Sequence, residues 1–286
     1  MPGGEQLALL DEPRGSITLW EFLTGSIRRL DVIDPDSDGA LASFAISPDG
    51  THVAVSGRMG RWKNEITVRH IFDGSRVVDL KLVGCARQII FGSDNASLTV
   101  AKERYNRRKK KFSAYVCKWD IEDGEQTNER GPFPMAGTRR RGNTLGYAGI
   151  HLSPDGRMLA TIRGNRIVVI EVATGRHTTV GPHPSRAVLG ATGEFGSSRT
   201  LLRALAFDPS GYVLATGAVG SQTVWLWSMA GSSSAEQLLQ PDLDSVRALE
   251  YSPSGRLLAA GNIVYGKPSR GEVNVWRMKG NELPID

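Results

Sequence analysis

The segment that decides the fold is LAFDPSGYVLAT, residues 205–216. A short apolar stretch is followed by the polar turn Asp-Pro-Ser-Gly and by a second apolar stretch. In such a turn the proline presets φ and the glycine accepts a positive φ, so that the tetrapeptide joins two strands tightly. We therefore expect a β-hairpin at residues 205–216.

The same pattern occurs five times along the chain, and a repeat of this length must be identified before any other feature. The other copies are FAISPDGTHVAV (44–55), IIFGSDNASLTV (89–100), IHLSPDGRMLAT (150–161) and LEYSPSGRLLAA (249–260). In every copy an apolar residue stands three positions after the turn glycine, or after Asn95 in the second copy, and the next residue is small. This predicts a packed second strand with close neighbours.

A third strand is expected after each hairpin, and it ends in a slot that recurs every 49 to 57 residues, as blades of a propeller do. Three residues before the slot there is always a β-branched residue, which favours a buried strand. A turn glycine follows four or five residues after the slot. The six slots are filled by Trp20, Arg69, Trp119, Ile170, Trp227 and Trp276.

This pattern resembles that of WD40 repeats, in which the third strand ends in a Trp-Asp pair. The pair is intact only at Trp119-Asp120, and no Gly-His dipeptide opens a repeat. A hydrogen-bonded tetrad of the standard WD40 kind is therefore not expected, and a TolB-like or YVTN-like propeller is the near alternative. The resemblance implies an all-β propeller of about six four-stranded blades in one domain, residues 1–286, acting as a protein-binding scaffold.

The first blade is expected to be incomplete, because the alignment places the N-terminus at the turn between the first and second strands. The alternatives are a part of a larger ring of seven or more blades, a mis-started reading frame, an open ring, and a closed six-bladed ring with one three-stranded blade. The blades are expected at about residues 1–33 (partial), 34–80, 81–133, 144–182, 198–240 and 244–286.

Composition agrees with a globular protein: 40% of the residues are hydrophobic and 23% charged, with a net charge of +5. No window reaches the roughly 18 apolar residues of a membrane helix, and the first ten residues do not read as a signal peptide. Cys85 and Cys117 lack metal-ligand spacing, so we expect a reducing, cytoplasmic location and no zinc site.

Binding is expected on one face of the propeller, because all long insertions fall in one class of loop. These insertions are residues 57–65, 102–113, 125–143, 177–199 and 261–271. Three of them are basic, and two of these three also contain an aromatic residue, Trp62 or Tyr105. The candidate partner-binding residues are Arg58, Arg61, Trp62, Lys63, Arg104, Tyr105, Arg107, Arg108, Lys109, Lys110, Lys111, Arg139, Arg140 and Arg141.

Such cations can receive an acidic protein or peptide, or neutralise phosphates in a nucleic acid, which is the weaker alternative. They can also be solvated charges at strand ends. A further alternative is that the propeller belongs to a larger enzyme, such as a peptidase or a kinase. No membrane span and no small-molecule substrate are expected.

No catalytic residue is proposed, because the chain lacks nucleophile-elbow, zinc-protease and phosphate-loop motifs. His52, His70 and His151 fall at repeat positions and are expected to be structural. The segment Asp34–Gly39 resembles the start of a calcium loop, but Ala45 stands where the bidentate glutamate belongs. We therefore expect no metal, no cofactor and a non-catalytic scaffold.

Overall fold

The computed structural model shows an all-β protein whose described residues form 22 strands. The chain divides into two compact units, residues 1–133 and 134–286. Each unit is described by itself. No helix in the described part of the chain is long and apolar enough to cross a membrane. The structure describes residues 6–11, 16–21, 24–31, 41–59, 63–109, 111–135, 149–163, 166–182, 201–219, 223–229, 235–239, 246–264 and 270–278.

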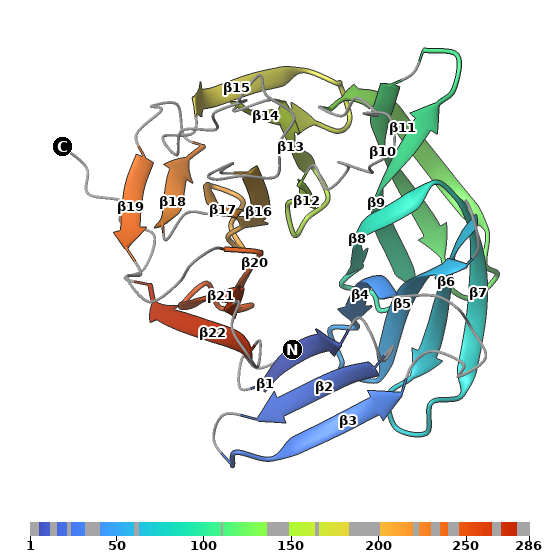
Figure 1. Cartoon of the computed structure of the whole chain (residues 1–286). Coiled ribbons are helices and arrows are strands. Elements are labelled where there is room, and N and C mark those ends of the chain that lie inside the picture. Colours follow the sequence, from blue (N-terminus) through green and yellow to red (C-terminus); the bar gives the residue numbers. More distant parts are fainter. Residues whose placement is uncertain are drawn as a thin grey trace. The chain divides into compact units, whose positions relative to one another are not determined.

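The first unit contains three antiparallel sheets, each formed by strands that are consecutive in the chain (Figure 1). The strands of these sheets are β1 (Gln6–Asp11), β2 (Ser16–Glu21) and β3 (Ile27–Asp31); β4 (Leu41–Ile46), β5 (His52–Met59), β6 (Lys63–His70) and β7 (Arg76–Val83); and β8 (Cys85–Phe91), β9 (Ser97–Asn106), β10 (Lys111–Asp120) and β11 (Gln126–Pro134).

The second unit also contains three antiparallel sheets of consecutive strands. Its strands are β12 (Ile150–Leu152), β13 (Met158–Arg163), β14 (Arg166–Glu171) and β15 (His177–Pro182); β16 (Leu201–Phe207), β17 (Val213–Val219), β18 (Thr223–Ser228) and β19 (Ala235–Leu239); and β20 (Ala248–Tyr251), β21 (Leu257–Val264) and β22 (Arg270–Arg277). The six sheets are propeller blades. In the described residues four of them have four strands, and the first and the last have three.

The strand register confirms the alignment of the repeats. In each sheet the slot residue lies opposite the apolar residue that follows the turn by three positions. The six pairs are Leu7↔Trp20, Val53↔Arg69, Leu98↔Trp119, Leu159↔Ile170, Leu214↔Trp227 and Leu258↔Trp276. The predicted turns are confirmed as well: Gly211 has a φ of 75°, and Asn95, in place of the glycine, has a φ of 56°.

A serine hydroxyl holds the turn between the first and second strands. Ser153 Oγ accepts a 2.9 Å hydrogen bond from Met158 N and donates one of 2.5 Å to Asp155. Asp208 replaces this serine in the LAFDPSGYVLAT copy, and its carboxylate accepts the equivalent bond from Val213 N at 2.7 Å. A short polar side chain at this position therefore satisfies a strand N–H that would lack a partner at the turn.

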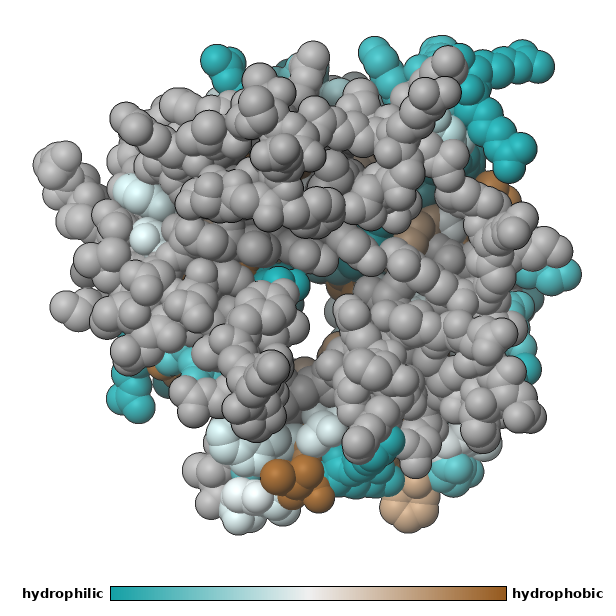
Figure 2. Space-filling view, in the orientation of Figure 1, coloured by the Kyte–Doolittle hydropathy of each residue, from teal (hydrophilic) through white to brown (hydrophobic). Residues whose placement is uncertain are grey.

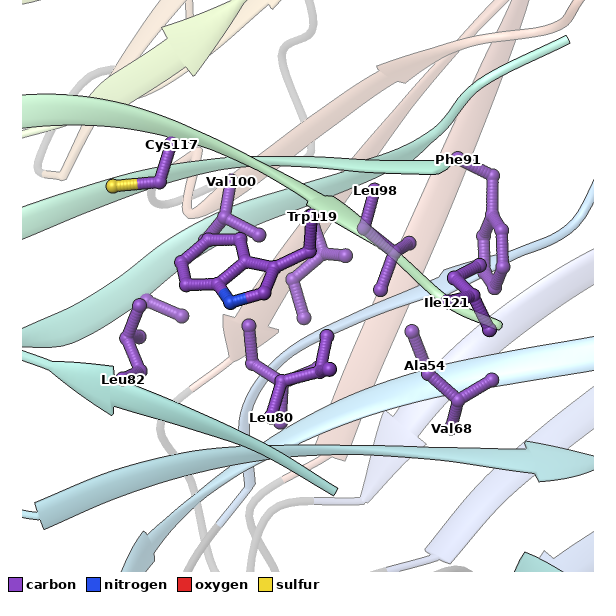
Figure 3. Close-up of a cluster of buried hydrophobic side chains, with 13 residues drawn as sticks. Ala54, Val68, Leu80, Leu82, Phe91, Leu98, Val100, Cys117, Trp119 and Ile121 are labelled. Carbon is purple, nitrogen blue, oxygen red and sulfur yellow. The ribbon is translucent and has the colours of Figure 1, made fainter. Parts of the chain in front are cut away.

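The hydrophobic cores lie between consecutive sheets of a unit. In the first unit, Leu80 and Leu82 of β7 pack against Leu98, Val100 and Trp119 of the next sheet (Figure 3). In the second unit, Trp227 packs in the same way against residues of the preceding sheet. Every sheet with a neighbour on either side in its unit therefore contributes to two cores, one on each face.

Trp227 also makes a hydrogen bond of the kind that the sequence did not lead us to expect. Its Nε1 donates to Thr216 Oγ1 at 2.9 Å, and both side chains are buried. The bond links the third strand of the sheet to the second and satisfies the indole N–H inside the core. The other buried slot tryptophan, Trp119, lies beside Val100, which has no hydroxyl group.

The predicted long insertions are largely wrong in kind, because strands continue through them. Strand β5 extends to Met59 and β6 begins at Lys63, so that most of residues 57–65 is paired. Residues 102–113 are mostly the ends of β9 and β10, and residues 126–134 form β11. The strand ends were predicted from the point where the apolar pattern stops. Backbone hydrogen bonds between two strands do not need apolar side chains, so the pairing can continue past that point.

Candidate functional site

The strongest candidate site is the hairpin formed by β9 and β10, which is paired over ten residues on each strand. Its turn is held by Asn106, whose Oδ1 accepts a 2.9 Å hydrogen bond from Lys109 N. The cations of this turn and of the strand that follows are exposed: Arg107, Arg108, Lys109 and Lys111. We call these four residues the basic tip. Hydrophilic side chains gather over this end of the hairpin at the upper right of Figure 2.

The cations at the base of the same hairpin have an acidic partner within the protein. Lys102 has 1% of its side chain exposed, and its Nζ lies 2.7 Å from Glu129 Oε2 on the adjacent strand β11. Arg104 Nη2 lies 3.3 Å from the same oxygen, and its guanidinium stacks 4.5 Å above the ring of Tyr115. Glu129 is therefore the shared counterion of two cations.

The thiol of Cys117 completes this buried cluster. Its Sγ donates a 3.3 Å hydrogen bond to Glu129 Oε2. Burial raises the pKa of the Cys117 thiol to about 11, with a smaller opposing effect from Lys102, so that the thiol stays protonated at neutral pH. Burial also raises the pKa of Glu129, but hydrogen bonds from Lys102 and Cys117 outweigh it and leave that pKa below its usual value. Within the cluster Glu129 stays ionised beside its two cations, and the protonated thiol is a poor nucleophile.

The ion pairs of the base contrast with the tip. Within the part of the chain that the structure describes, no acidic side chain forms an ion pair with Arg107, Arg108, Lys109 or Lys111. At the base one carboxylate offsets one of two cations, whereas the tip presents four cations to solvent with no such partner in that part of the chain. Lys102 and Arg104 therefore have a structural role, whereas the cations of the basic tip remain available for a partner.

The aromatic residue that the sequence associated with this hairpin is already engaged. Tyr105 lies directly across the strand pair from Phe112, and the two rings are 4.9 Å apart at an angle of 51°. Such a cross-strand pair stabilises a two-stranded extension. Tyr105 is thus placed as a support of the hairpin.

The remaining candidate residues are only partly located. Arg58 lies within β5, and Lys63 is the first residue of β6, paired with Met59. Arg61, Trp62, Lys110 and Arg139–Arg141 lie outside the described residues. The structure therefore brings together the candidates of the β9–β10 hairpin, and whether the others join them stays a prediction.

Lys102 and Glu129 are the members of this site that the sequence did not single out. Lys102 marked only the start of a predicted loop, and Glu129 stood inside another. Their contact depends on β11 pairing beside β10. The WD40 resemblance implied a fourth strand in this blade, but residues 125–143 were expected to be an insertion, so Glu129 was not placed on a strand. Along β11 only Phe133 is buried, so no alternation of buried and exposed residues marks this strand.

In the described residues, no group of three or more His, Cys, Asp or Glu side chains is placed to hold a metal ion. The calcium-like segment Asp34–Gly39 lies outside the described residues. Both cysteines are free thiols.

His151 of β12 has its ring 6.2 Å from the ring of Phe207, and burial lowers its pKa to about 4. In the unfolded chain the pKa of a histidine is about 6.5. The unfolded state therefore binds the proton first, and we expect stability to fall as the pH drops from about 6.5 to 4, by at most about 1.4 kcal/mol per pH unit from this residue. Urea unfolding across this range checks it, and H151F should flatten the decline.

Comparisons with known proteins agree with the fold. Residues 191–228 match the model of the WD domain, G-beta repeat, and this segment contains β16, β17 and β18. No curated protein matches the chain by sequence.

Two solved structures resemble the chain at low identity. Hydrazine synthase of Kuenenia stuttgartiensis is 15% identical with a TM-score of 0.60, over 96% of this chain and 80% of that one. The β-propeller domain of Cps50 (Swd1) from Myceliophteria thermophila is 13% identical with a TM-score of 0.59, over 96% of this chain and 94% of that one. At these identities the likeness is one of fold.

Proposed function

We propose that this β-propeller, whose blades include a WD40 repeat, is a non-catalytic scaffold that binds an acidic segment of a partner protein at the basic tip. WD40 propellers generally serve as platforms for protein interaction, and function on such a fold must be argued from the site. The observation that carries the proposal is the contrast within one hairpin. Lys102 and Arg104 share Glu129 as their counterion, whereas the four cations of the tip have no ion pair in the described residues.

The hairpin is suited to present these charges. Ten paired residues, the Tyr105–Phe112 contact and the hydrogen bond to Asn106 stabilise it. A rigid element loses less conformational entropy on binding than a flexible loop does. Complementary charge would also raise the association rate, which falls with ionic strength.

The packing of Tyr105 favours an acidic protein segment over nucleic acid as the partner. Nucleic-acid sites without sequence preference combine cations with aromatic faces on which bases stack. Tyr105 packs on Phe112, and this contact supports the protein-binding alternative. Membership of a larger enzyme stays a competing hypothesis, and a cytoplasmic location stays a prediction.

The test is charge reversal at the tip. We expect R107E, R108E and K109E combined to weaken binding of a fluorescent peptide rich in Asp and Glu by at least about tenfold, because each lost cation at an interface is worth on the order of 1 kcal/mol. Fluorescence polarisation at two salt concentrations measures it.

The matched control reverses three exposed cations of the second unit: R157E, R176E and R256E. It changes the net charge by the same amount and should leave the affinity almost unchanged. Equal losses in the two triple variants would show that net charge alone attracts the peptide, and the proposed site would be wrong. Tighter binding of a single-stranded oligonucleotide than of the peptide would favour the nucleic-acid alternative.

A further inference from the structure

Two histidines face one another across strands β5 and β6. His52 is the first residue of β5 and His70 the last of β6, and the register pairs them directly. Next to the pair, Ile71 N donates a 2.8 Å hydrogen bond to Thr51 O. This is the pattern around a non-hydrogen-bonded pair, in which the two side chains approach most closely. The two imidazole rings are accordingly 4.6 Å apart between centroids and tilted by 40°.

The repeat accounts for the places of these two residues but not for their type. In the other five sheets the same register position holds no histidine, and the pairs there are Gln6↔Glu21, Ser97↔Asp120, Met158↔Glu171, Val213↔Ser228 and Leu257↔Arg277. A blade of this protein therefore folds without an imidazole at either position. Solvent reaches both rings, because His70 is exposed and His52 is half-buried.

Hydrogen bonds set the tautomer of His52. Thr51 Oγ1 lies 2.8 Å from Asp49 Oδ1 and 2.6 Å from His52 Nδ1. An ionised carboxylate only accepts hydrogen bonds, so the hydroxyl of Thr51 donates its proton to Asp49. Thr51 Oγ1 then accepts from His52 Nδ1–H, and the lone pair of the neutral ring is on Nε2. A metal-ligating histidine usually has this arrangement, with a hydrogen-bond partner on one ring nitrogen and the metal on the other.

The turn that carries these hydrogen bonds is fixed on both sides. Asp49 Oδ1 also accepts a 2.5 Å hydrogen bond from Ser47 Oγ and one of 3.0 Å from Thr51 N. Asp49 N donates a 3.1 Å hydrogen bond to Asn95 Oδ1, in the turn of the next sheet. The ring of His52 is therefore oriented by a rigid support.

A pair of neutral imidazoles is a ligand set for a divalent ion of the late first transition row. A metal bonded about 2 Å from one nitrogen of each ring holds the two ring centres roughly 4.5–5 Å apart. The rings of His52 and His70 already have this separation. The carboxylates of Asp49 and Asp73 interact electrostatically with His52 and His70 respectively, and their charge favours a cation at this place.

We propose that His52 and His70 form a two-histidine binding site for a divalent transition-metal ion such as Ni²⁺, Cu²⁺ or Zn²⁺, with water at the remaining coordination positions. Two protein ligands are fewer than the four of a structural zinc site, so the ion is not required for folding. The site lies in a different sheet from the basic tip and does not depend on the proposed function.

Calorimetric titration of the untagged full chain with NiCl₂ tests the site. We expect one saturable site per chain, and binding weaker by about tenfold or more in H52Q and in H70Q, because a lost ligand costs at least as much as a lost hydrogen-bond partner of a ligand. H177Q is the matched control, since His177 is exposed at the start of β15 and lies opposite Ile170. An absence of saturable binding, or an equal loss in H177Q, would overturn the proposal.

Variants of Thr51 test its role as a positioning residue. T51V should weaken Ni²⁺ binding by about tenfold, because it removes the hydroxyl that orients the ring of His52. T51S keeps the hydroxyl and should retain the affinity of the natural chain. Thermal unfolding without metal checks that both variants are folded. Equal affinities of T51V and T51S would contradict the role given to Thr51.

Nitrogen-15 NMR of the unsubstituted chain tests the site without any variant. The imidazole of His52 should carry its proton on Nδ1. Paramagnetic Ni²⁺, added at less than one equivalent, should broaden the imidazole signals of His52 and His70 before that of His177. Uniform broadening of all three signals would show non-specific binding and would overturn the proposal.

Discussion

Replacing Glu129 by alanine is expected to lower the free energy of unfolding by about 3 kcal/mol, because it leaves Lys102 buried without a counterion. Lys102 has only 1% of its side chain exposed, and its Nζ lies 2.7 Å from Glu129. The value falls at the low end for a buried pair because Glu129 itself is 30% exposed. Urea denaturation at neutral pH measures the change.

Two controls separate the buried charge from the loss of a surface pair. R176A removes an ion pair with Glu171 whose arginine is 82% exposed, and it should cost less than about 1 kcal/mol. The double variant K102M/E129L removes both charges and should recover much of the stability lost in E129A, because no charge is then buried alone. A loss in E129A no larger than that in R176A would contradict this account of the cluster.

The Glu129 cluster should also respond to acid. Its carboxyl has a lowered pKa in the folded state, so the stabilisation is present above the usual glutamate value of 4.5 and is lost as the pH falls through the lower folded-state pKa. This acid dependence should be absent from the double variant.

Replacing Trp227 by alanine is expected to lower the free energy of unfolding by about 3–5 kcal/mol, the usual range for a large aromatic residue removed from a core. The side chain is 2% exposed and packs in the core between the β12–β15 and β16–β19 sheets. The change would also remove the hydrogen bond that Thr216 Oγ1 accepts from the indole N–H. Thermal unfolding followed by near-UV circular dichroism provides the measurement.

Trp20 offers a matched control, since it fills the same slot in a different sheet. W20A should cost only about 1 kcal/mol, because the side chain is 36% exposed. W227F keeps most of the apolar area and loses the hydrogen bond, so its effect should lie between those of the other two. Equal destabilisation by W20A and W227A would mean that the slot, and not burial, determines the effect.

The repeat pattern predicted the blades well because period and turn chemistry are local properties of the sequence. The alignment identified Leu214 and Trp227 as repeat positions, which the structure pairs across β17 and β18, and Gly211 has the positive φ that its turn requires. These features depend on residues within about 25 positions of one another. The register of a whole sheet follows from them, because a shift by one residue would turn every apolar side chain to the wrong face.

The ion pairs of the β9–β10 hairpin were predicted less well because they join residues that are far apart in the sequence. The sequence marked Arg104 as a binding residue, but the structure places it between Glu129 and Tyr115. Nothing near Arg104 in the sequence reveals Glu129 as its counterion, since the contact requires β11 to exist and to pair with β10. The exposed tip at Arg107 and Lys109 was predictable, because a turn between paired strands presents its charges to solvent.

The arrangement of the hydrophobic cores along the chain bears on how the protein folds during its synthesis. Each of the four cores formed by the described residues is shared by two sheets that follow one another along the chain. The residues that form the core around Trp119 end at Ile121, so that core can close while the second unit is still being translated. Chains in which each module contacts its neighbours assemble stepwise, N-terminal end first. The order in which a ribosome releases this chain is therefore also an order in which its cores can form.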